Sequence, residues 1–309
     1  MPVDLVTVGL VCADVMVRPV NEVPERGRLG LVPQLEMHVG GLAGVTAAVY
    51  CRLGGSAAFI GRVGQDSFGD HLVNSLAAFG VDTHGVRRDP ERRSSATVVL
   101  ISSDGERTFL HHTGATAALS EHDVDFGLVG HAKVLHWGGP GVTPGLSGAP
   151  IGRVFQKARD LGVKTSLDTC YDGSGAWLSL IEAALPHLDI ALTSLEEARL
   201  YTGQTTPEAI AKFLHGYGVS TVLVKLGADG VYFADKRTSG TLPAHKVRVV
   251  DTTGAGDAAC AGFLYGYIMG WDLPRCARMA NAAGALTVQV MGGAEGVHSF
   301  DDALRLVET

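Results

Sequence analysis

The alternation of apolar and amphipathic segments between residues 133 and 226 is the feature that most limits the folds open to this 309-residue chain. Alternating strands and helices predict a parallel, doubly wound sheet with right-handed crossovers. A large buried core is consistent with 46% hydrophobic and only 18% charged residues. The expected strands are 133–137, 164–167, 189–192 and 221–226, and the expected helices are 151–161, 177–185, 195–201 and 207–217.

The first part of the chain interrupts this alternation with segments of hairpin character. A buried strand at 5–11 leads into a polar stretch with alternating character at 15–38, and two further strands flank an Asp-Gly turn at 103–106. We therefore expect an α/β fold with a doubly wound, mostly parallel sheet flanked by helices. We predict a single domain, 1–309, with a small β lid formed by residues 13–39 and 94–113.

Charge and cysteine content exclude several classes of function. The 25 Lys and Arg against 32 Asp and Glu give a net charge of −7, which argues against nucleic acid or an anionic membrane as the main partner. Asp4 and Asp14 interrupt the apolar start, so we predict neither a signal peptide nor a membrane anchor and expect a cytoplasmic protein. The five widely spaced cysteines fit reduced thiols better than disulfides or a metal site.

Residues 249–263 read VVDTTGAGDAACAGF and carry the strongest functional signal. Gly254, Ala255 and Gly256 would leave backbone N–H groups unobstructed at a helix N-terminus, which suits an anion. A carboxylate at Asp257 would repel a bound phosphate. It suits a base that takes the proton of a substrate hydroxyl while the amides hold the phosphoryl group being transferred.

A helix-capping turn is the structural alternative for this segment. Gly262 and Gly266 follow within the predicted helix, and each costs about 1 kcal/mol relative to alanine. Their presence predicts that another element packs very close to this helix.

The segment DTTGAGDAACAGFL at 251–264 closely resembles the C-terminal signature of the PfkB, or ribokinase-like, carbohydrate kinases. The resemblance extends over essentially the whole chain. It implies a doubly wound α/β core with a β lid, and transfer of the γ-phosphoryl group of ATP, with Mg²⁺, to a hydroxyl of a sugar or nucleoside. It also implies that Asp257 is the catalytic base and that Gly254, Ala255 and Gly256 form the anion hole.

The same resemblance suggests where the substrate binds. Asp14 stands where family members hold sugar hydroxyls, and residues 40–41 match a diglycine that lets the backbone approach the substrate. Val45 replaces a common Asn, which predicts a more apolar pocket. Each assignment has a structural alternative. Asp14 could be an ordinary loop aspartate, residues 40–41 could form a strand-to-helix turn, and the hairpin could be a solvated edge strand. The predicted substrate-binding residues are Asp14, Gly40, Gly41, Val45, Arg107 and His112.

The nucleotide side is predicted by resemblance alone. Residues 194–197 are similar to an Asn-x-x-Glu motif, with Ser194 in place of the Asn and Glu197 as the glutamate that orients Mg²⁺-bound water in the family; the pair also fits a capping box. Asp251 and Thr253, with the 292–296 loop, resemble a monovalent cation site for which K⁺ is the candidate ion. The predicted nucleotide-binding residues are Ser194, Lys225, Gly227, Gly230, Thr252, Asn281 and Gly284.

These observations favour an ATP-dependent sugar kinase. Sugar is preferred to a nucleoside because Asp14 offers hydroxyl recognition while aromatic residues for base stacking are scarce near the predicted pocket. A nucleoside kinase and a non-catalytic nucleotide- or sugar-binding regulator are the alternatives. A dinucleotide-dependent dehydrogenase is disfavoured because no Gly-x-Gly-x-x-Gly follows the first strand. Exposed lid strands favour a homodimer.

Overall fold

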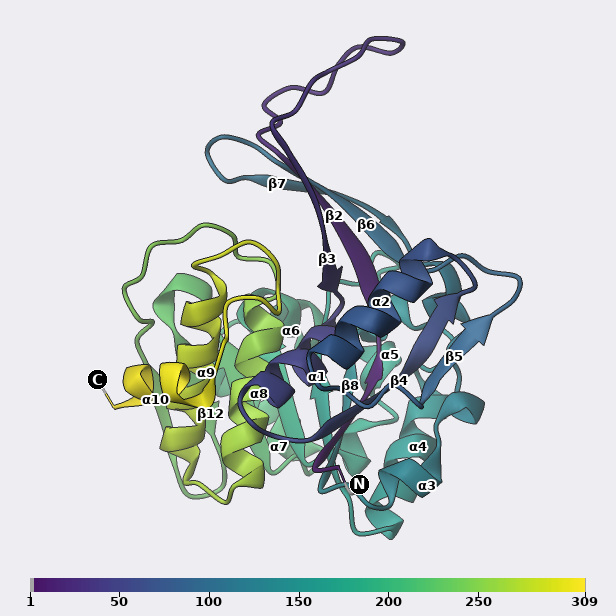
Figure 1. Ribbon diagram of the computed structural model, residues 1–309. Coiled ribbons are helices and arrows are strands. Elements are labelled where there is room, and N and C mark those ends of the chain that lie inside the picture. The colour runs from purple at the N-terminus through teal and green to yellow at the C-terminus, as the bar shows by residue number, and fades with distance from the viewer. Residues whose placement is uncertain (1–2, 309) are drawn as a thin grey trace.

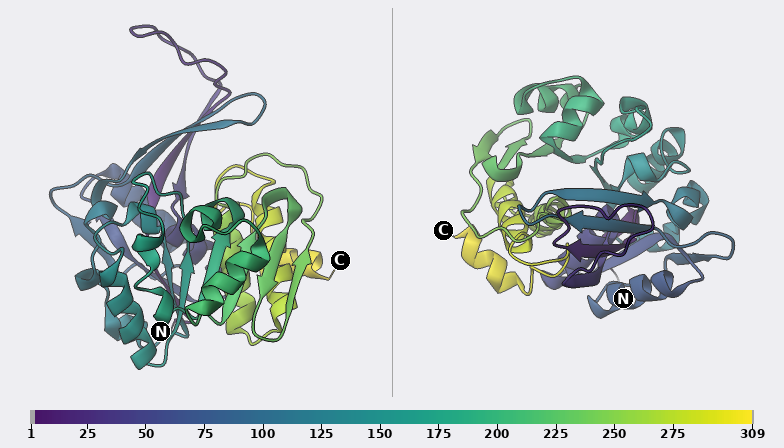
Figure 2. Two further views of the ribbon diagram at one scale, coloured as in Figure 1. Left: turned by 180° about the vertical axis from the view of Figure 1, so that it is seen from behind. Right: turned by 90° about the horizontal axis from the view of Figure 1, so that it is seen from above.

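A computed structural model describes residues 3–308, which form a nine-stranded sheet with helices on both faces (Figures 1 and 2). The strand order is β13-β12-β11-β10-β9-β8-β1-β4-β5, and every pairing from β11 to β5 is parallel. The strands are β1 (Leu5–Gly9), β4 (Ala57–Gly64), β5 (Val86–Asp89), β8 (Val134–Gly138), β9 (Lys164–Asp168), β10 (Ile190–Ser194), β11 (Thr221–Lys225), β12 (Val231–Ala234) and β13 (Ser239–Leu242). The predicted doubly wound, mostly parallel fold is confirmed, while the antiparallel β12 and β13 extend it at one edge.

Two apolar layers hold the helices against the sheet. One layer packs α1 (Leu42–Arg52), α2 (Ser67–Ala78), α8 (Ala255–Ile268), α9 (Leu273–Thr287) and α10 (Phe300–Val307) on one face. The other packs α3 (Phe126–Val129), α4 (Ala149–Asp160), α5 (Leu178–Ile181), α6 (Leu195–Thr202) and α7 (Pro207–Gly216) on the opposite face. Among residues 3–308, no helix is long and apolar enough to cross a membrane.

The helix predicted at 177–185 is shorter in the structure. Trp177 has a left-handed φ of 42°, and its N–H and that of Ala176 donate to the Asp172 carboxylate at 2.9 and 2.6 Å. This loop geometry delays the start of α5 to Leu178, and a 3₁₀ turn with Pro186 in its first positions follows from Leu185. The prediction was wrong because local side-chain bonding overrode the helical pattern.

A second, four-stranded sheet stands at the carboxyl end of β1, where the chain runs on into β2 (Figure 1). Its order is β3-β2-β6-β7, and β2 pairs in parallel with β6. The strands are β2 (Cys12–Arg18), β3 (Gln34–Gly40), β6 (Ala96–Ile101) and β7 (Arg107–His112). Residues 19–33 connect β2 to β3 as an exposed arm that projects beyond the sheet (Figure 1). That this sheet acts as a lid, within a single domain 1–309, stays a prediction; residues 1–2 and 309 lie outside the described part of the chain.

Helix α8 is buried on nearly all sides, and α9 packs directly against it. A Cβ added at Gly262 would lie 2.5 Å from the carbonyl oxygen of Met279, and one at Gly266 would lie 3.1 Å from Cys276 Sγ. The close packing predicted from these two glycines is confirmed. It fixes α8, and therefore the loop before it, relative to the sheet.

Candidate active site

The start of α8 forms the floor of the candidate site. Gly254 is the N-cap, with a left-handed φ of 72°, and a Cβ there would collide with the Cα atom of Gly293. The first backbone bond of the helix runs from Ala258 N–H to Gly254 C=O at 2.8 Å. The N–H groups of Gly256 and Asp257 therefore precede the helical hydrogen-bond ladder, in the arrangement that binds anions.

Asp257 lies on the first turn of α8, within the same cluster as three other carboxylates. Burial, the nearby charge of Asp168 and the charges of Glu197 and Asp14 raise the pKa of Asp257 to about 8, against the attraction of Lys225. The Thr46 hydroxyl on α1 donates to the Asp257 carbonyl oxygen at 3.2 Å, which ties α1 to α8. A carboxyl group with this pKa can accept a proton near neutral pH.

The ends of β9 and β11 form an ion pair, of which only Lys225 was predicted from the sequence. Lys225, at the end of β11, donates from Nζ to both carboxylate oxygens of Asp168, at the end of β9, at 2.7 and 2.9 Å. The Cys260 thiol on α8 donates to Asp168 at 3.2 Å. Lys225 was predicted to bind nucleotide, but Asp168 was not singled out. Its position at the carboxyl end of a parallel strand was the available signal.

Ser194 and Glu197 have separate partners. The Ser194 hydroxyl caps α6 by accepting from the Glu197 N–H at 3.3 Å, so the N-cap half of the capping box is confirmed. The Glu197 carboxylate instead accepts a bond of 2.8 Å from the Thr169 hydroxyl, which also contacts Thr193 at 2.6 Å. Glu197 is thus directed toward the end of β9, and Thr169 is a further contributor that the sequence analysis did not name.

Asp14 is buried at the base of the second sheet. Its carboxylate accepts from the Cys12 thiol at 3.1 Å and lies directly against Gly40, where any Cβ would overlap it. Burial raises the pKa of Asp14. Gly41 has a φ of 92° and approaches the backbone of Leu10, so both glycines serve close approaches within the protein. Their approach to the substrate stays a prediction.

Val45 is buried on α1 and faces Gly293, next to the start of α8. The two side chains predicted from β7 differ in position. His112 is exposed at the strand end, whereas Arg107 donates from Nη1 to the Thr253 hydroxyl at 3.0 Å. The substrate-binding roles of Val45, Arg107 and His112 stay predictions.

The residues predicted to hold a monovalent cation already face protein partners. Asp251 Oδ1 accepts from the backbone N–H and hydroxyl of Thr253, and Oδ2 accepts from Gly292 N–H at 3.3 Å. Arg107 lies 3.9 Å from Asp251. An arginine charge therefore occupies the neighbourhood where K⁺ was predicted, and these residues do not fit a monovalent cation.

The other predicted nucleotide residues line the approach to α8 from β11 and α9. Gly227 and Gly230 form the turn between β11 and β12, where Leu226 N–H donates to Gly230 C=O at 2.8 Å. Asn281 donates from Nδ2 to the Pro243 carbonyl at 3.0 Å. Gly284 lies near the Ala255 carbonyl and Thr252 is exposed. Their contacts with nucleotide stay predictions.

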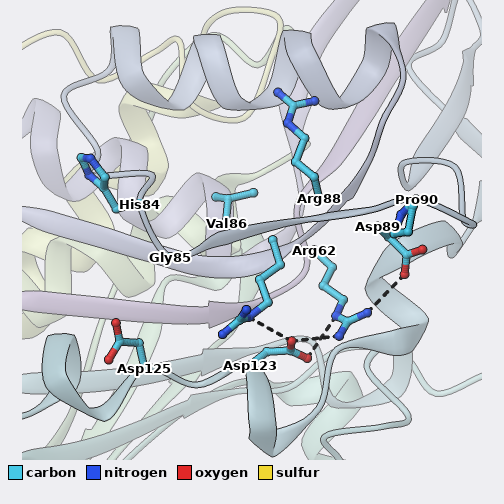
Figure 3. Close-up of a pocket in the computed structure, with 10 residues that line it drawn as sticks. Arg62, His84, Gly85, Val86, Arg88, Asp89, Pro90, Asp123 and Asp125 are labelled. Atoms are coloured by element: carbon cyan, nitrogen blue, oxygen red, sulfur yellow. Dashed lines mark hydrogen bonds and ion pairs between the residues drawn. The ribbon is translucent and has the colours of Figure 1, made fainter.

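A hollow of about 510 Å³ lies elsewhere, beside β4 and β5 (Figure 3). Four of its charged side chains are paired with one another: Arg62 bonds to Asp89 and Asp123 at 3.2 and 2.9 Å, and Arg87 lies 3.2 Å from Asp123. None of the predicted site residues lines this hollow. It is therefore separate from the candidate active site.

Comparison with known proteins decides the family. The pfkB family carbohydrate kinase pattern matches residues 4–299. The chain belongs to the pfkB family of carbohydrate kinases. The chain is 34% identical to the probable fructokinase-6, chloroplastic, of Arabidopsis thaliana, over 88% of this chain and 76% of that protein. It is 29% identical to the 2-dehydro-3-deoxygluconokinase of Thermoproteus tenax, over 91% and 89%.

A solved structure of Arabidopsis thaliana ribokinase complexed with ribose and ATP superposes with a TM-score of 0.85 at 27% identity and covers 100% of both chains. As a pfkB carbohydrate kinase, the chain is a phosphotransferase whose acceptor is an alcohol group. The family implies the use of ATP. The identity of the acceptor is a separate question, because the relatives are named for different sugars.

Proposed function

We propose that this protein transfers the γ-phosphoryl group of ATP to a hydroxyl of a small sugar or sugar acid, with Asp257 as the general base. One observation carries the proposal: the free N–H groups of Gly256 and Asp257 share a helix turn with a carboxyl group whose pKa is raised to about 8. An anion-binding turn and a proton acceptor at the same place are the two requirements of phosphoryl transfer to an alcohol.

The residues around Asp257 take complementary parts. Asp257 removes the proton of the attacking hydroxyl, while the N–H groups of residues 254–257 stabilise the charge on the phosphoryl oxygens. Glu197 and Thr169 place a hard oxygen ligand beside the nucleotide site, which fits Mg²⁺ held through water. Bound Mg²⁺ would neutralise part of the phosphate charge.

The sugar would lie between α8 and the second sheet. Asp14 faces this space from the base of β2 and can accept hydrogen bonds from two neighbouring hydroxyls. The second sheet would exclude water, which otherwise accepts the phosphoryl group in place of the sugar. The relatives named above suggest fructose, 2-dehydro-3-deoxygluconate and ribose as the first sugars to test.

The test is release of ADP from Mg-ATP across these three sugars, further hexoses, pentoses and sugar acids, and a set of nucleosides. We expect ADP release that depends on one class of sugar and falls at least about 10³-fold in Asp257→Asn, because general-base catalysis and correct charge are lost together. Retained ATP binding in the variant, measured by calorimetry, shows that the fold is intact. Near-normal turnover in Asp257→Asn would contradict the mechanism. Turnover with nucleosides alone would show that the acceptor is a nucleoside and not a sugar.

We also propose that a second copy of this chain is the partner of the second sheet. The β2–β3 arm and the outer strands expose several large apolar side chains, a density that is unusual on a monomer. These are Val23, Leu29, Leu31, Leu35, Phe109 and Leu110.

A further inference from the structure

The Asp168–Lys225 pair lies directly against the catalytic turn. A Cβ added at Gly256 would lie 3.2 Å from Lys225 Nζ, so the ammonium group touches the first turn of α8. Cys260, one turn further along the same face of α8, lies 3.5 Å from Nζ and 3.2 Å from Asp168. The pair thus connects the ends of β9 and β11 to the helix that carries Asp257.

The donors of Lys225 are already used. An ammonium group has three N–H donors. Asp168 takes two of them, and Cys260 Sγ lies in reach of the third. A direct bond from Lys225 to phosphate would require one of these contacts to be exchanged, so in this structure the ammonium acts as a fixed charge.

We propose that Asp168 is a positioning residue for phosphoryl transfer: it fixes the Lys225 ammonium against the first turn of α8 and offsets its charge, so that Asp257 keeps the proton affinity that a base needs. This inference rests on the proposed function, in which Asp257 accepts the hydroxyl proton. Without Asp168, the same ammonium would stand uncompensated beside Asp257 and would favour its charged, less basic form.

The charged groups that face Asp257 come from four elements. Asp14 on β2, Asp168 on β9 and Glu197 on α6 are negative, and Lys225 on β11 is the positive group that opposes them. Burial lowers the pKa of Lys225, but the charge and hydrogen bond of Asp168, together with Cys260 and Glu197, raise it overall, so the lysine stays charged. Asp168 is therefore the one group in this set that acts on Asp257 both through its own charge and by holding the opposing charge in place.

The experiment measures kcat/KM for the sugar against pH, at one saturating Mg-ATP concentration, in variants at the pair. In Asp168→Asn, we expect the acidic limb of the profile to move to lower pH by about one unit and the plateau rate to fall, because the base is weaker. In the double variant Asp168→Asn with Lys225→Met, both charges are gone and the limb should return to within about 0.3 units of the unmodified protein. Asp168→Glu keeps the charge and should leave the limb in place.

A second Asp–Lys pair, in which the aspartate is buried and the lysine is exposed, provides the control. Asp189, which precedes β10, accepts from Lys164 Nζ at 2.9 Å at the opposite end of the sheet. Asp189→Asn should lower the urea midpoint without moving the limb. An unmoved limb in Asp168→Asn would overturn the inference, as would a limb that stays displaced in the double variant. Activity that survives in Asp257→Asn would overturn the proposed function itself, so the two failures are distinguishable.

Discussion

At the scale of single residues, the proposed mechanism depends on the charge of Asp257. Its pKa is raised to about 8 because burial and neighbouring carboxylates disfavour the ionised form. We predict that kcat/KM for the sugar rises with pH between about 7 and 9, since only the deprotonated carboxylate accepts a proton. A profile that is flat from pH 6 to 9 would contradict this assignment.

The same shift affects stability with the opposite sense. The folded protein binds the Asp257 proton more tightly than the unfolded chain does. The contribution of Asp257 to the free energy of unfolding is therefore fully present below pH 3.8, the ordinary pKa of an aspartate in an unfolded chain. It is lost as the pH rises through about 8. Asp257→Asn should be more resistant to urea than the unmodified protein at pH 9, and the two should converge near pH 4. Equal urea midpoints of the two proteins at both pH values would show that folding does not raise the pKa of Asp257.

The sequence predicted the part of the site that lies in one segment. Residues 254–257 form the predicted glycine turn at the start of α8, with Asp257 on its first turn, so local pattern and resemblance were enough to locate this helix start. Its binding and catalytic roles stay predictions. Asp168 and Thr169 were missed because their partners, Lys225 and Glu197, lie far along the chain and only the parallel sheet brings them together. A charge pair between the ends of two strands leaves no recognisable pattern in either local sequence segment.

At the scale of secondary-structure elements, the contact between α8 and α9 determines where the turn at residues 254–257 lies. Gly262→Ala would place a methyl group 2.5 Å from the Met279 carbonyl, so we predict a loss of about 1–3 kcal/mol in the free energy of unfolding, despite the better helix propensity of alanine. Gly216→Ala is the matched control, because Gly216 is exposed at the end of α7 with no atom within 4 Å of an added Cβ. It should be neutral or gain up to about 1 kcal/mol. Urea unfolding of both variants checks this, and a neutral Gly262→Ala would mean that α9 can move aside.

Element prediction succeeded where periodicity and packing agree. The parallel core follows from its strand and helix alternation, whereas α5 was shortened by the backbone bonds of Asp172. The edge strands β12 and β13 are four residues each and were not recognised. Short antiparallel edges depend on pairing with a neighbour, which hydrophobic periodicity alone does not report.

At the scale of the whole molecule, the exposed apolar face of the second sheet should determine the oligomeric state. Leu31 is 90% exposed and Leu110 is 64% exposed, and both lie on segments that project from the body. We predict a dimer in light scattering coupled to size exclusion, and a monomer for the Leu31→Glu and Leu110→Glu double variant, because buried charges without partners oppose association. Leu200→Glu, at an exposed leucine of α6, should leave the dimer intact. A monomer at every concentration would contradict the proposal.

The parallel pairing of β2 with β6 also bears on the order in which the chain assembles. Ala13 pairs with Ala96, and the intervening chain contributes α1, β4, α2 and β5 to the main body. Because β2 can pair with β6 only when these intervening elements have brought the two strands together, the second sheet should form after the body has collapsed. A partly refolded chain would then contain the turn at residues 254–257 before the second sheet stands over it. We expect competence for phosphoryl transfer to the sugar, rather than to water, to be the last property that this protein acquires as it folds.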